Sequence, residues 1–319
     1  MPNPRASLEA ELRGVSGLAI RPGEPLAERT TFRIGGPAEL FVEVESEAAL
    51  SRLLGIADAS GTPRFLLGLG SNLLVPDEGL SGLVIHLGGE LERIEIDGTT
   101  VRCGAAVPLP KLAQRTVAAG LSGLEALAGF PSTVGGAVVM NAGCYGSEIG
   151  DVLTSARVVD PGGVPRTVSV AELAPAYRST RLQGGAAVVT GATFELVPGD
   201  AEAGLERIRE INRLRWRSLP RGRNAGSIFR NPPGDSAGRL IDVCGLKGLA
   251  HGGARISPRH GNVIVNEDHA TALDVLELMV AAREAVRRRF GVELVPEVVL
   301  AGSLAGVWRE RTAAPASSL

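Results

Sequence analysis

The sequence predicts an α+β fold in which two glycine-rich blocks precede a distinct C-terminal domain. Segments with helical spacing are interspersed with short apolar runs that glycine, asparagine and proline interrupt. Forty-two of the 319 residues are glycine, about twice the usual share, and they lack the period of collagen. At residues 199–220 a helical pattern carries a heavy charge load, so we place a domain boundary there.

The overall composition is that of a globular protein with more than one core. Hydrophobic residues make up 44% and charged residues 21% of the chain, which argues against long disorder. The length is sufficient for two or three hydrophobic cores. The net charge of −2 and the 3% aromatic content argue against a nucleic-acid partner. The composition leaves the oligomeric state open, a monomer included.

The cysteines and the apolar runs predict the compartment. Cys103, Cys144 and Cys244 have no metal-binding spacing and cannot all pair with one another, so we expect a reducing compartment and no metal. No apolar run approaches the roughly 20 residues that a membrane helix requires, and the N-terminus has no signal-peptide core. We therefore expect a cytoplasmic protein without a membrane partner.

The N-terminal half begins with a helix, strands and a hairpin. Residues 46–59 predict a helix, because a serine can cap its start and the leucines recur on one face. Residues 64–89 predict short strands and tight loops, since glycine, asparagine and proline divide the apolar runs. Residues 94–103 alternate around Asp97-Gly98, which predicts a hairpin.

A helix, a second hairpin and a strand follow. Residues 108–120 predict a helix with Pro110 at its first position and Gly120 just beyond its end. Residues 153–170 predict a hairpin that turns at "DPGG", and residues 186–198 predict a strand.

The C-terminal part predicts a compact α+β unit and shows no internal repeat. We expect two helices, three strands and a frayed tail at residues 309–319. The helices are predicted at 236–245 and 271–291, and the strands at 252–257, 262–266 and 292–300.

The first glycine-rich stretch is "GLGSN", Gly68 to Asn72, after a predicted strand. It resembles the start of a dinucleotide fingerprint, but Leu73 occupies the place of the third glycine and Pro76 excludes a following helix. What remains is a turn whose amide groups can bind phosphate without a helix behind it. A plain strand-to-strand turn is the alternative.

The second glycine-rich stretch, residues 123–146, contains six glycines and no charged residue except Glu125. Neither helical nor strand spacing extends through it, and a surface loop would be more polar. Such a segment suits backbone that lies against a large planar ligand. An interface between two subdomains is the alternative.

Ser227 lies in "RNAGSIFRNPP", a segment crowded with arginine and asparagine. The segment has no G-x-S-x-G elbow and no neighbouring histidine, so an acyl-transfer nucleophile is excluded. The residues alone favour a turn serine. Arg178 alone indicates no function, and Glu297 alone could equally face solvent or fill an ion-paired or functional role.

Several long motifs, in order, resemble the UDP-N-acetylenolpyruvoylglucosamine reductases, the flavoenzymes of bacterial cell-wall synthesis. They include "TTFRIGGPAEL", "LGLGSNLLVPDEGLSGLVI", "GFPSTVGGAVVMNAGCYG", "AYRSTRL", "NAGSIFRNPPGDSAGRLID" and "GLKGLAHGGARISPRHGNVIVN". The resemblance implies a two-part FAD-binding fold of the vanillyl-alcohol-oxidase (PCMH) type, followed by a C-terminal α+β substrate domain. We expect subdomains at 1–64 and 65–198, the substrate domain at 199–302 and a tail at 303–319.

The resemblance implies a reaction, its cofactors and its substrate. The expected reaction reduces UDP-N-acetylglucosamine enolpyruvate to UDP-N-acetylmuramate in peptidoglycan synthesis. FAD, bound without a covalent link, would act as the hydride carrier, and NADPH would be the reductant. The expected partner is therefore a small-molecule substrate.

The resemblance also implies site residues. Ser227 would donate a proton to the substrate, Arg178 would polarise it, and Glu297 would complete the catalytic site. The expected cofactor-binding residues are Gly68, Leu69, Gly70, Ser71, Asn72, Gly135, Gly136, Asn141, Ala142 and Gly143. The expected substrate-binding residues are Tyr177, Asn231, Lys247 and His260.

The spacing of two motifs predicts the branch of the family. Only 48 residues separate Arg178 from Ser227, so the chain resembles the shorter branch of the family, without the insertion that carries a substrate-covering tyrosine. A flavin-dependent oxidase of the same fold and a nucleotide-binding module without chemistry are the alternative functions.

Overall fold

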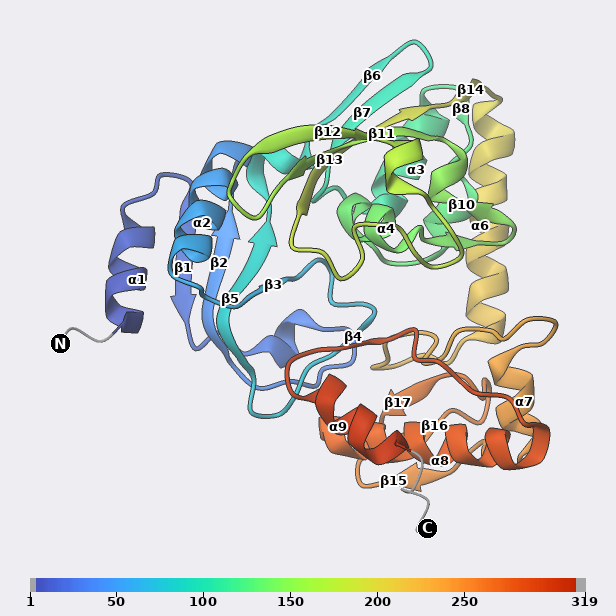
Figure 1. The fold of residues 1–319 in the computed structure, drawn as a ribbon. Helices are drawn as coiled ribbons and strands as arrows, with labels where there is room; N and C mark the ends of the chain where they lie inside the picture. The colour runs from blue at the N-terminus through green and yellow to red at the C-terminus, as the bar shows by residue number, and fades with distance from the viewer. Residues whose placement is uncertain (1–3, 314–319) are drawn as a thin grey trace. The chain divides into compact units, whose positions relative to one another are not determined.

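The computed structural model describes residues 4–313 and divides them into two compact units (Figure 1). Unit 1 combines the chain up to Pro22 with Leu40–Leu69 and Gly82–Arg215. Unit 2 combines Gly23–Glu39 and Gly70–Ser81 with the chain from Trp216 onward. Both units therefore contain segments that are far apart in the sequence. The expected bounds of the two FAD-binding subdomains stay a prediction.

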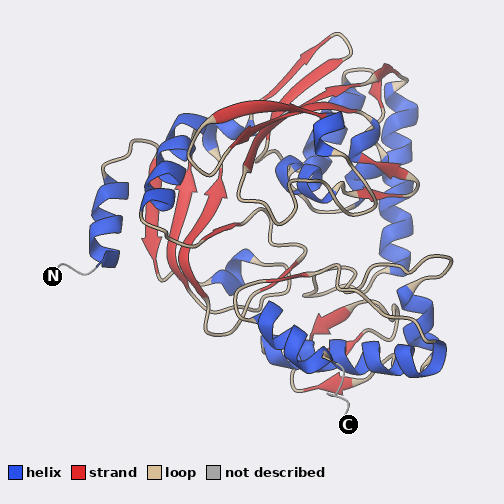
Figure 2. Ribbon diagram, in the orientation of Figure 1, coloured by secondary structure: helices blue, strands red, loops and turns tan. Residues whose placement is uncertain are grey.

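Unit 1 contains two principal sheets and most of the helices (Figure 2). The first sheet has the order β1-β2-β5-β3, with β3 parallel to β5, and the second is an antiparallel sheet of order β12-β11-β13-β7-β6. The strands of the first sheet are β1 (Leu18–Pro22), β2 (Ala38–Val44), β3 (Arg64–Leu66) and β5 (Leu80–Leu87). Those of the second are β6 (Ile94–Asp97), β7 (Thr100–Gly104), β11 (Leu153–Val159), β12 (Pro165–Ser169) and β13 (Val188–Glu195).

The remaining elements of this part are helices and two short strand pairs. The helices are α1 (Pro4–Arg13), α2 (Glu47–Ala59), α3 (Leu109–Ala118), α4 (Val134–Met140), α5 (Val170–Leu173) and α6 (Ala201–Ser218), which continues past Arg215 into unit 2. The short pairs are β8 (Leu121–Ser122) with β14 (Val197–Pro198), and β9 (Gly143–Cys144) with β10 (Ser147–Glu148). Short 3-10 turns occupy Gly89–Glu92, Ala126–Gly129 and Ile149–Asp151.

Local sequence signals explain several of these elements. The Ser46 hydroxyl accepts a hydrogen bond from Ala49 N at 3.2 Å, and α2 buries an apolar face that includes Leu50 and Leu53. The hairpin of β6 and β7 turns at Gly98-Thr99, one residue later than expected, because Asp97 still pairs with Thr100. The predicted helix and hairpin are both confirmed, as are the hairpin of β11 and β12 and the strand β13.

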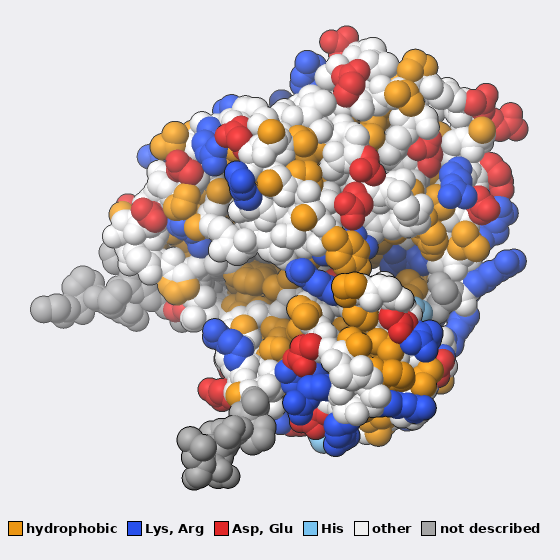
Figure 3. Space-filling model, turned by 45° about the vertical axis from the view of Figure 1, so that its right-hand side comes forward, with side chains coloured by type: hydrophobic (Ala, Val, Ile, Leu, Met, Phe, Trp, Pro, Cys, Tyr) orange, Lys and Arg blue, Asp and Glu red, His pale blue; other side chains and the backbone are white. Residues whose placement is uncertain are grey.

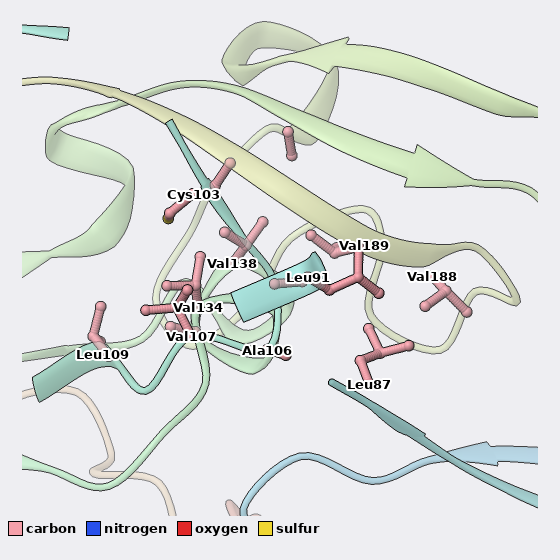
Figure 4. Packing of buried hydrophobic residues seen from close by; sticks show 14 of the residues in the cluster. Leu87, Leu91, Cys103, Ala106, Val107, Leu109, Val134, Val138, Val188 and Val189 are labelled. Carbon is pink, nitrogen blue, oxygen red and sulfur yellow. The ribbon is translucent and has the colours of Figure 1, made fainter. Parts of the chain in front are cut away.

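Helix α4 and the second sheet share the core of unit 1. Val134 and Val138 are fully buried, and Figure 4 shows them gathered with Cys103 and Val107. Sequence spacing did not indicate this helix, because Gly135 and Gly136 lower helix propensity and interrupt the apolar period. Burial of the valines stabilises it instead, as tertiary packing does for most short helices.

Unit 2 is built around a three-stranded antiparallel sheet with a long helix packed on it. The sheet contains β15 (Ala250–His251), β16 (Ala254–Ile256) and β17 (Ile264–Asn266). The helices are α7 (Ala237–Val243), α8 (Ala272–Phe290) and α9 (Leu304–Thr312), and α8 packs on β15, β16, α7 and α9. A 3-10 turn (Leu26–Arg29) and the parallel pair of β4 (Leu73–Leu74) with β18 (Val299–Leu300) complete the unit.

Helix α8 has the ends that its sequence predicts. Thr271 and Asp274 form a capping box at its start, in which each side chain accepts a hydrogen bond from the other's backbone N–H. Gly291 follows the helix with φ of 67°, a left-handed conformation that favours glycine. Local capping chemistry therefore determines both ends.

Two C-terminal predictions differ from the structure. Of residues 292–300, only Val299–Leu300 form a strand, because Pro296 has no N–H to donate and pairs through an isolated bridge with Phe229. The tail was expected to be frayed from residue 309, but α9 continues to Thr312. The rest of that tail, residues 314–319, lies outside the described residues.

The distribution of surface charge and the apolar character of the helices bear on the partners of the fold. On the face drawn in Figure 3, acidic and basic side chains are interspersed rather than gathered into one patch of a single sign. Within residues 4–313, no helix has both the length and the apolar character to cross a membrane.

Candidate active site

The first glycine-rich loop passes from unit 1 into unit 2 between Leu69 and Gly70. In unit 1, a Cβ atom on Gly68 would lie 3.0 Å from the Thr133 hydroxyl, so a larger residue would require the threonine side chain to shift. In unit 2, Gly70 has φ of 60°, and a Cβ there would lie 2.2 Å from the carbonyl oxygen of Arg29. Close backbone contact and a left-handed conformation both require glycine at position 70.

The loop supplies hydrogen-bond donors that the protein itself leaves unused. Among residues 4–313, the N–H groups of Gly68, Leu69 and Gly70 have no hydrogen-bond acceptor. Such successive amides bind phosphate oxygens. Within unit 1, the amides of Gly68 and Leu69 are therefore available to a phosphate group, without a helix directly behind the loop, and the expected binding of FAD by this loop stays a prediction.

The start of α4 does not offer a comparable donor set. Val134 N and Gly135 N donate to the carbonyl oxygens of Val107 and Ala105, both at 2.9 Å, and Gly136 N donates to the Thr133 hydroxyl. A Cβ on Gly135 would lie 2.9 Å from the Ala105 Cβ. Gly135 thus allows α4 to pack closely, and its N–H is already used within the protein.

Asn141 organises the second glycine-rich loop. It is buried and left-handed, with φ of 41° at the end of α4. Its Nδ2 donates to Glu148 at 2.6 Å and to the Ala176 carbonyl at 3.0 Å, while its Oδ1 accepts from Gly150 N at 3.1 Å. The amide therefore connects the loop to the segment that carries Tyr177 and Arg178.

Arg178 is held against this loop in unit 1. Its Nη2 donates to the Gly143 carbonyl at 2.6 Å, and its Nη1 lies 3.8 Å from Glu148 Oε1. The guanidinium also lies 5.0 Å from the centroid of the Tyr177 ring. The side chain is 19% exposed, so its orientation is set by the protein while part of it remains accessible.

Cys144, in the same loop, is a neutral thiol. Burial raises the pKa of Cys144 to about 11, although the charges of Arg178 and Arg215 act in the opposite direction. Its Sγ donates to the Ala126 carbonyl at 2.9 Å. A neutral, hydrogen-bonded thiol is a poor nucleophile, which disfavours covalent attachment of a flavin at this position.

In unit 2, backbone pairing brings the segments of Ser227 and Glu297 together. Arg230 N donates to the Val295 carbonyl at 2.9 Å, and Glu297 N donates to the Ile228 carbonyl at 2.8 Å. Ser227 and Glu297 are both half-buried. Two residues that are 70 positions apart in the sequence thus lie on neighbouring extended segments.

Asn72 supports the same pair of segments within unit 2. Its Nδ2 donates to the Glu297 carbonyl at 3.1 Å, and its own carbonyl accepts from Val299 N at 3.0 Å. One N–H of the Asn72 amide therefore holds the backbone of Glu297, and the expected role of Asn72 in binding the cofactor stays a prediction.

Asn262 is a positioning residue that the sequence did not indicate. It is 3% exposed, and its Oδ1 accepts from Phe229 N at 2.9 Å while its Nδ2 donates to the Phe229 carbonyl at 2.7 Å. Its main-chain carbonyl also accepts from Ile228 N at 2.9 Å. In the sequence it is only the first residue of a predicted strand, and no local signal marks a buried amide.

The expected substrate-binding residues of unit 2 gather around α7. Asn231 Oδ1 accepts from Ala237 N at 3.1 Å at the start of this helix. Lys247 Nζ lies 2.6 Å from Asp242 Oδ2, near the other end. His260 lies against Gly238, and its Nδ1 accepts from Asn262 N at 3.2 Å. Burial and the charge of Lys247 lower the pKa of His260, so the ring is neutral with its proton on Nε2.

Two family models match the chain. The "FAD binding domain" model matches residues 38–169, which include both glycine-rich loops. The model described as "UDP-N-acetylenolpyruvoylglucosamine reductase, C-terminal domain" matches residues 218–301, which include Ser227 and Glu297.

Similar proteins extend this match over nearly the whole chain. "UDP-N-acetylenolpyruvoylglucosamine reductase 2" of Symbiobacterium thermophilum is 48% identical over 284 residues, 89% of this chain and 92% of the relative. The chain belongs to the UDP-N-acetylenolpyruvoylglucosamine reductase family. The reductase of Moorella thermoacetica is 42% identical over 93% of this chain and 98% of its own length. The crystal structure of the Thermus caldophilus reductase (MurB) is 40% identical with a TM-score of 0.77, covering 89% of this chain and 99% of its own.

Membership of the reductase family confirms the predicted fold class and enzyme class. The chain has an α+β FAD-binding fold followed by a C-terminal α+β domain, and it is an FAD-dependent oxidoreductase. The family also favours a reductase over the two alternative functions, an oxidase and a module without chemistry. The predicted roles of individual site residues remain proposals.

Proposed function

We propose that this chain reduces the enolpyruvyl ether of UDP-N-acetylglucosamine to the lactyl ether, which gives UDP-N-acetylmuramate for peptidoglycan synthesis, with NADPH as the reductant. The observation that carries the proposal is the backbone pairing of the Ser227 and Glu297 segments within unit 2. The relatives that are 42–48% identical carry the name of this reductase, which supports the choice of substrate.

The reaction divides between the cofactor and the protein. The chemistry that FAD supplies when bound is hydride transfer, from NADPH and then to the terminal carbon of the enolpyruvyl group. Negative charge then builds at the neighbouring carbon and its carboxylate, and that carbon must receive a proton. The tasks of the protein are to stabilise this charge and to deliver the proton.

Ser227 is the proposed proton donor. Within the described residues its hydroxyl makes no hydrogen bond, so the proton on Oγ is available to a substrate. Asn262 and Asn72 hold the two backbone segments on which Ser227 and Glu297 lie. Proton transfer from a positioned group typically contributes about 10²- to 10⁴-fold to the rate. Glu297 places a carboxylate on the segment next to the serine.

Arg178 is the proposed electrostatic group. The planar guanidinium can bind a carboxylate with two parallel hydrogen bonds, which a lysine cannot do. Its contact with the Gly143 carbonyl fixes its orientation before substrate binds. Such preorganisation avoids a rearrangement during the reaction.

The sugar nucleotide would bind to the residues around α7 and to Tyr177. Asn231 Oδ1 accepts a hydrogen bond from Ala237 N, which fixes the orientation of the amide and leaves Nδ2 as a donor for the substrate. Lys247 supplies positive charge for a diphosphate, and neutral His260 supplies a donor at Nε2. In the shorter branch that we predict for this chain, these groups would act without a tyrosine-bearing insertion.

The compartment proposed for this reaction is the cytoplasm. Cys103, Cys144 and Cys244 are all free thiols, which is the state expected in a reducing environment.

Substrate-dependent NADPH oxidation tests the proposal. We expect the purified protein to contain FAD, and we expect addition of the enolpyruvyl sugar nucleotide to accelerate the loss of NADPH absorbance. In Ser227→Ala, NADPH should still reduce the flavin, while reoxidation by substrate should slow by about 10²-fold or more. Rapid reoxidation in this variant would remove Ser227 from its role, and no acceleration by substrate in the native protein would reject the reaction.

A further inference from the structure

Helix α9 lies beyond the region that the reductase family model matches, which ends at residue 301. The helix is nevertheless fixed to the rest of unit 2. Leu304 is 2% exposed, the Ser303 hydroxyl donates to Glu78 Oε1 at 2.5 Å, and Arg311 forms an ion pair with Glu277 of α8. It therefore occupies a defined position on this unit.

Trp308 of α9 packs against the segment that carries Ser227. Its ring centroid lies 6.2 Å from that of Phe229, with the ring planes tilted by 48°. This separation lies in the range of favourable aromatic pairs, about 4.5–7 Å. Phe229 is 1% exposed and follows Ser227 by two residues, so its ring is part of the local support of the serine.

Arg283 of α8 connects Trp308 to the segment that carries Glu297. Its guanidinium lies 6.0 Å from the centroid of the Trp308 ring, and it also forms an ion pair with Glu293. Glu293 precedes Glu297 by four residues on the same extended segment. The tryptophan is thus linked to both segments of the proposed site, through Phe229 and through Arg283.

The two kinds of contact to Phe229 are complementary. Asn262 fixes its main chain through two hydrogen bonds, whereas Trp308 fixes its ring. On the other side of Ser227, Gly226 has φ of 73° and open space around the position of a Cβ. Gly226 N donates to Asn224 Oδ1 at 3.0 Å, so a hydrogen bond holds the backbone on this side, whereas the packed aromatic pair holds the other side of the serine.

We propose that Trp308 is a positioning residue for Ser227, acting through Phe229. This inference rests on the proposed role of Ser227 as proton donor. Loss of the indole would allow the Phe229 ring and the preceding residues to move, and a displacement of the donor by about 1 Å can cost up to about 10²-fold in rate. Only the step that uses the serine proton should be affected.

The test measures two steps separately, the reduction of bound FAD by NADPH and its reoxidation by the substrate. Both steps are compared in full-length W308A, W308F and S227A, with R309A as the matched control. Arg309 is the exposed neighbour of Trp308 on the same helix, and its Nε donates to the Ala305 carbonyl within that helix. We expect W308A to bind FAD and to be reduced by NADPH normally, while reoxidation by substrate slows by about 10-fold or more. W308F should recover to within about 3-fold of the native rate, because it retains an aromatic ring next to Phe229.

Hydrogen exchange provides a readout that is independent of turnover. The peptide that contains residues 227–230 should exchange its amide protons faster in W308A than in the native protein, and R309A should not change it. A merely structural role would instead change exchange throughout unit 2.

The outcomes separate the two proposals. If S227A slows reoxidation and W308A does not, the role of Trp308 is refuted and the serine keeps its role. If S227A reoxidises normally, the proposed function fails. If W308A does not retain FAD, W308L replaces it, because leucine keeps apolar volume without a ring. Loss of FAD from both variants would also refute the inference, since Trp308 would then serve folding alone.

Discussion

The buried amide of Asn262 gives the sharpest prediction about the proposed active site. Phe229 N donates a hydrogen bond to Oδ1 of the Asn262 amide, and Nδ2 of the same amide donates to the Phe229 carbonyl at 2.7 Å. The first contact requires an acceptor at position 262 and the second requires a donor. Asn262→Asp keeps the first hydrogen bond and replaces the second donor with oxygen. Two oxygens would then face each other without a proton between them, and one would carry a buried charge.

The size of the effect follows from this geometry. Leaving an uncompensated charge in a buried position costs about 3–5 kcal/mol. For a domain of roughly 150–250 residues, about 1 kcal/mol shifts Tm by about 2–4 °C, so N262D should lower Tm by roughly 6–20 °C at neutral pH. Asn262→Ala loses both hydrogen bonds and should also be destabilised, by about 2–4 kcal/mol.

The two variants differ in their pH dependence. Only a protonated carboxyl at position 262 could donate to the Phe229 carbonyl, so the folded-state pKa of the new aspartate is raised above its unfolded value of about 3.9. The destabilisation is complete above the folded pKa, shrinks as the pH falls through it, and is smallest below about 3.9. Asn262→Ala has no group that titrates, so its deficit relative to the native protein stays constant.

Thermal unfolding of the holoenzyme between pH 4 and pH 7 measures the effect, with each variant compared with the native protein at the same pH. Asn212→Asp, a half-buried position on α6, is the control for the added charge. A Tm of N262D that equals the native value at pH 7 would refute the reasoning. So would a deficit that is unchanged at pH 4, because it would exclude a proton-dependent contact with Phe229.

Two further predictions follow from the first loop and from unit 1. Gly70→Ala should lower FAD affinity by about 10-fold or more, because the new Cβ of this left-handed residue would collide with the Arg29 carbonyl. The control is Gly23→Ala, since Gly23 has φ of 71° and open space around the position of a Cβ. Equal FAD titration curves for the two variants would contradict the predicted loss of affinity. The side-chain hydrogen bond from Arg157 and the bond from Thr190 lower the pKa of Glu47, although partial burial opposes them. This stabilisation is present above the unfolded pKa of about 4.3 and is lost as the pH falls through the lowered folded pKa. Glu47→Gln should therefore cost about 1 kcal/mol or less at pH 7, since the pair is partly exposed, and less at pH 3 than at pH 7. Urea unfolding at both pH values measures the difference, and an equal cost at the two pH values would contradict this prediction.

Elements with local signals were predictable, and elements that depend on distant contacts were not. Helix α8 has a capping box, an apolar face and a terminal glycine, all within its own sequence. Helix α4 contains two glycines and forms because Val134 and Val138 are buried by strands that are distant in the sequence. Helix α9 likewise depends on contacts with Phe229 and Glu277, and the sequence of residues 304–312 does not indicate these partners.

The candidate site shows the same division. The sequence motifs and their resemblance identified Ser227 and Glu297, although the residues by themselves favoured a turn and left two roles open. The hydrogen bonds of Asn72 and Asn262 that support these segments join residues 225 and 33 positions apart. A long-range contact through a side-chain amide leaves no periodic signal, so only the structure could show that these amides are occupied.

The interleaving of the two units has a consequence for how the chain matures during synthesis. Asn72 donates to the carbonyl of Glu297, and Thr31 donates to that of Asn224, so unit 2 needs segments from both ends of the chain. At about 5–20 residues translated per second, Asn72 would be added to the nascent chain roughly 10–45 s before Glu297. Throughout that interval the early strand β4 lacks its parallel neighbour β18, so Leu73 and Leu74 cannot complete their pairing until that strand has been made.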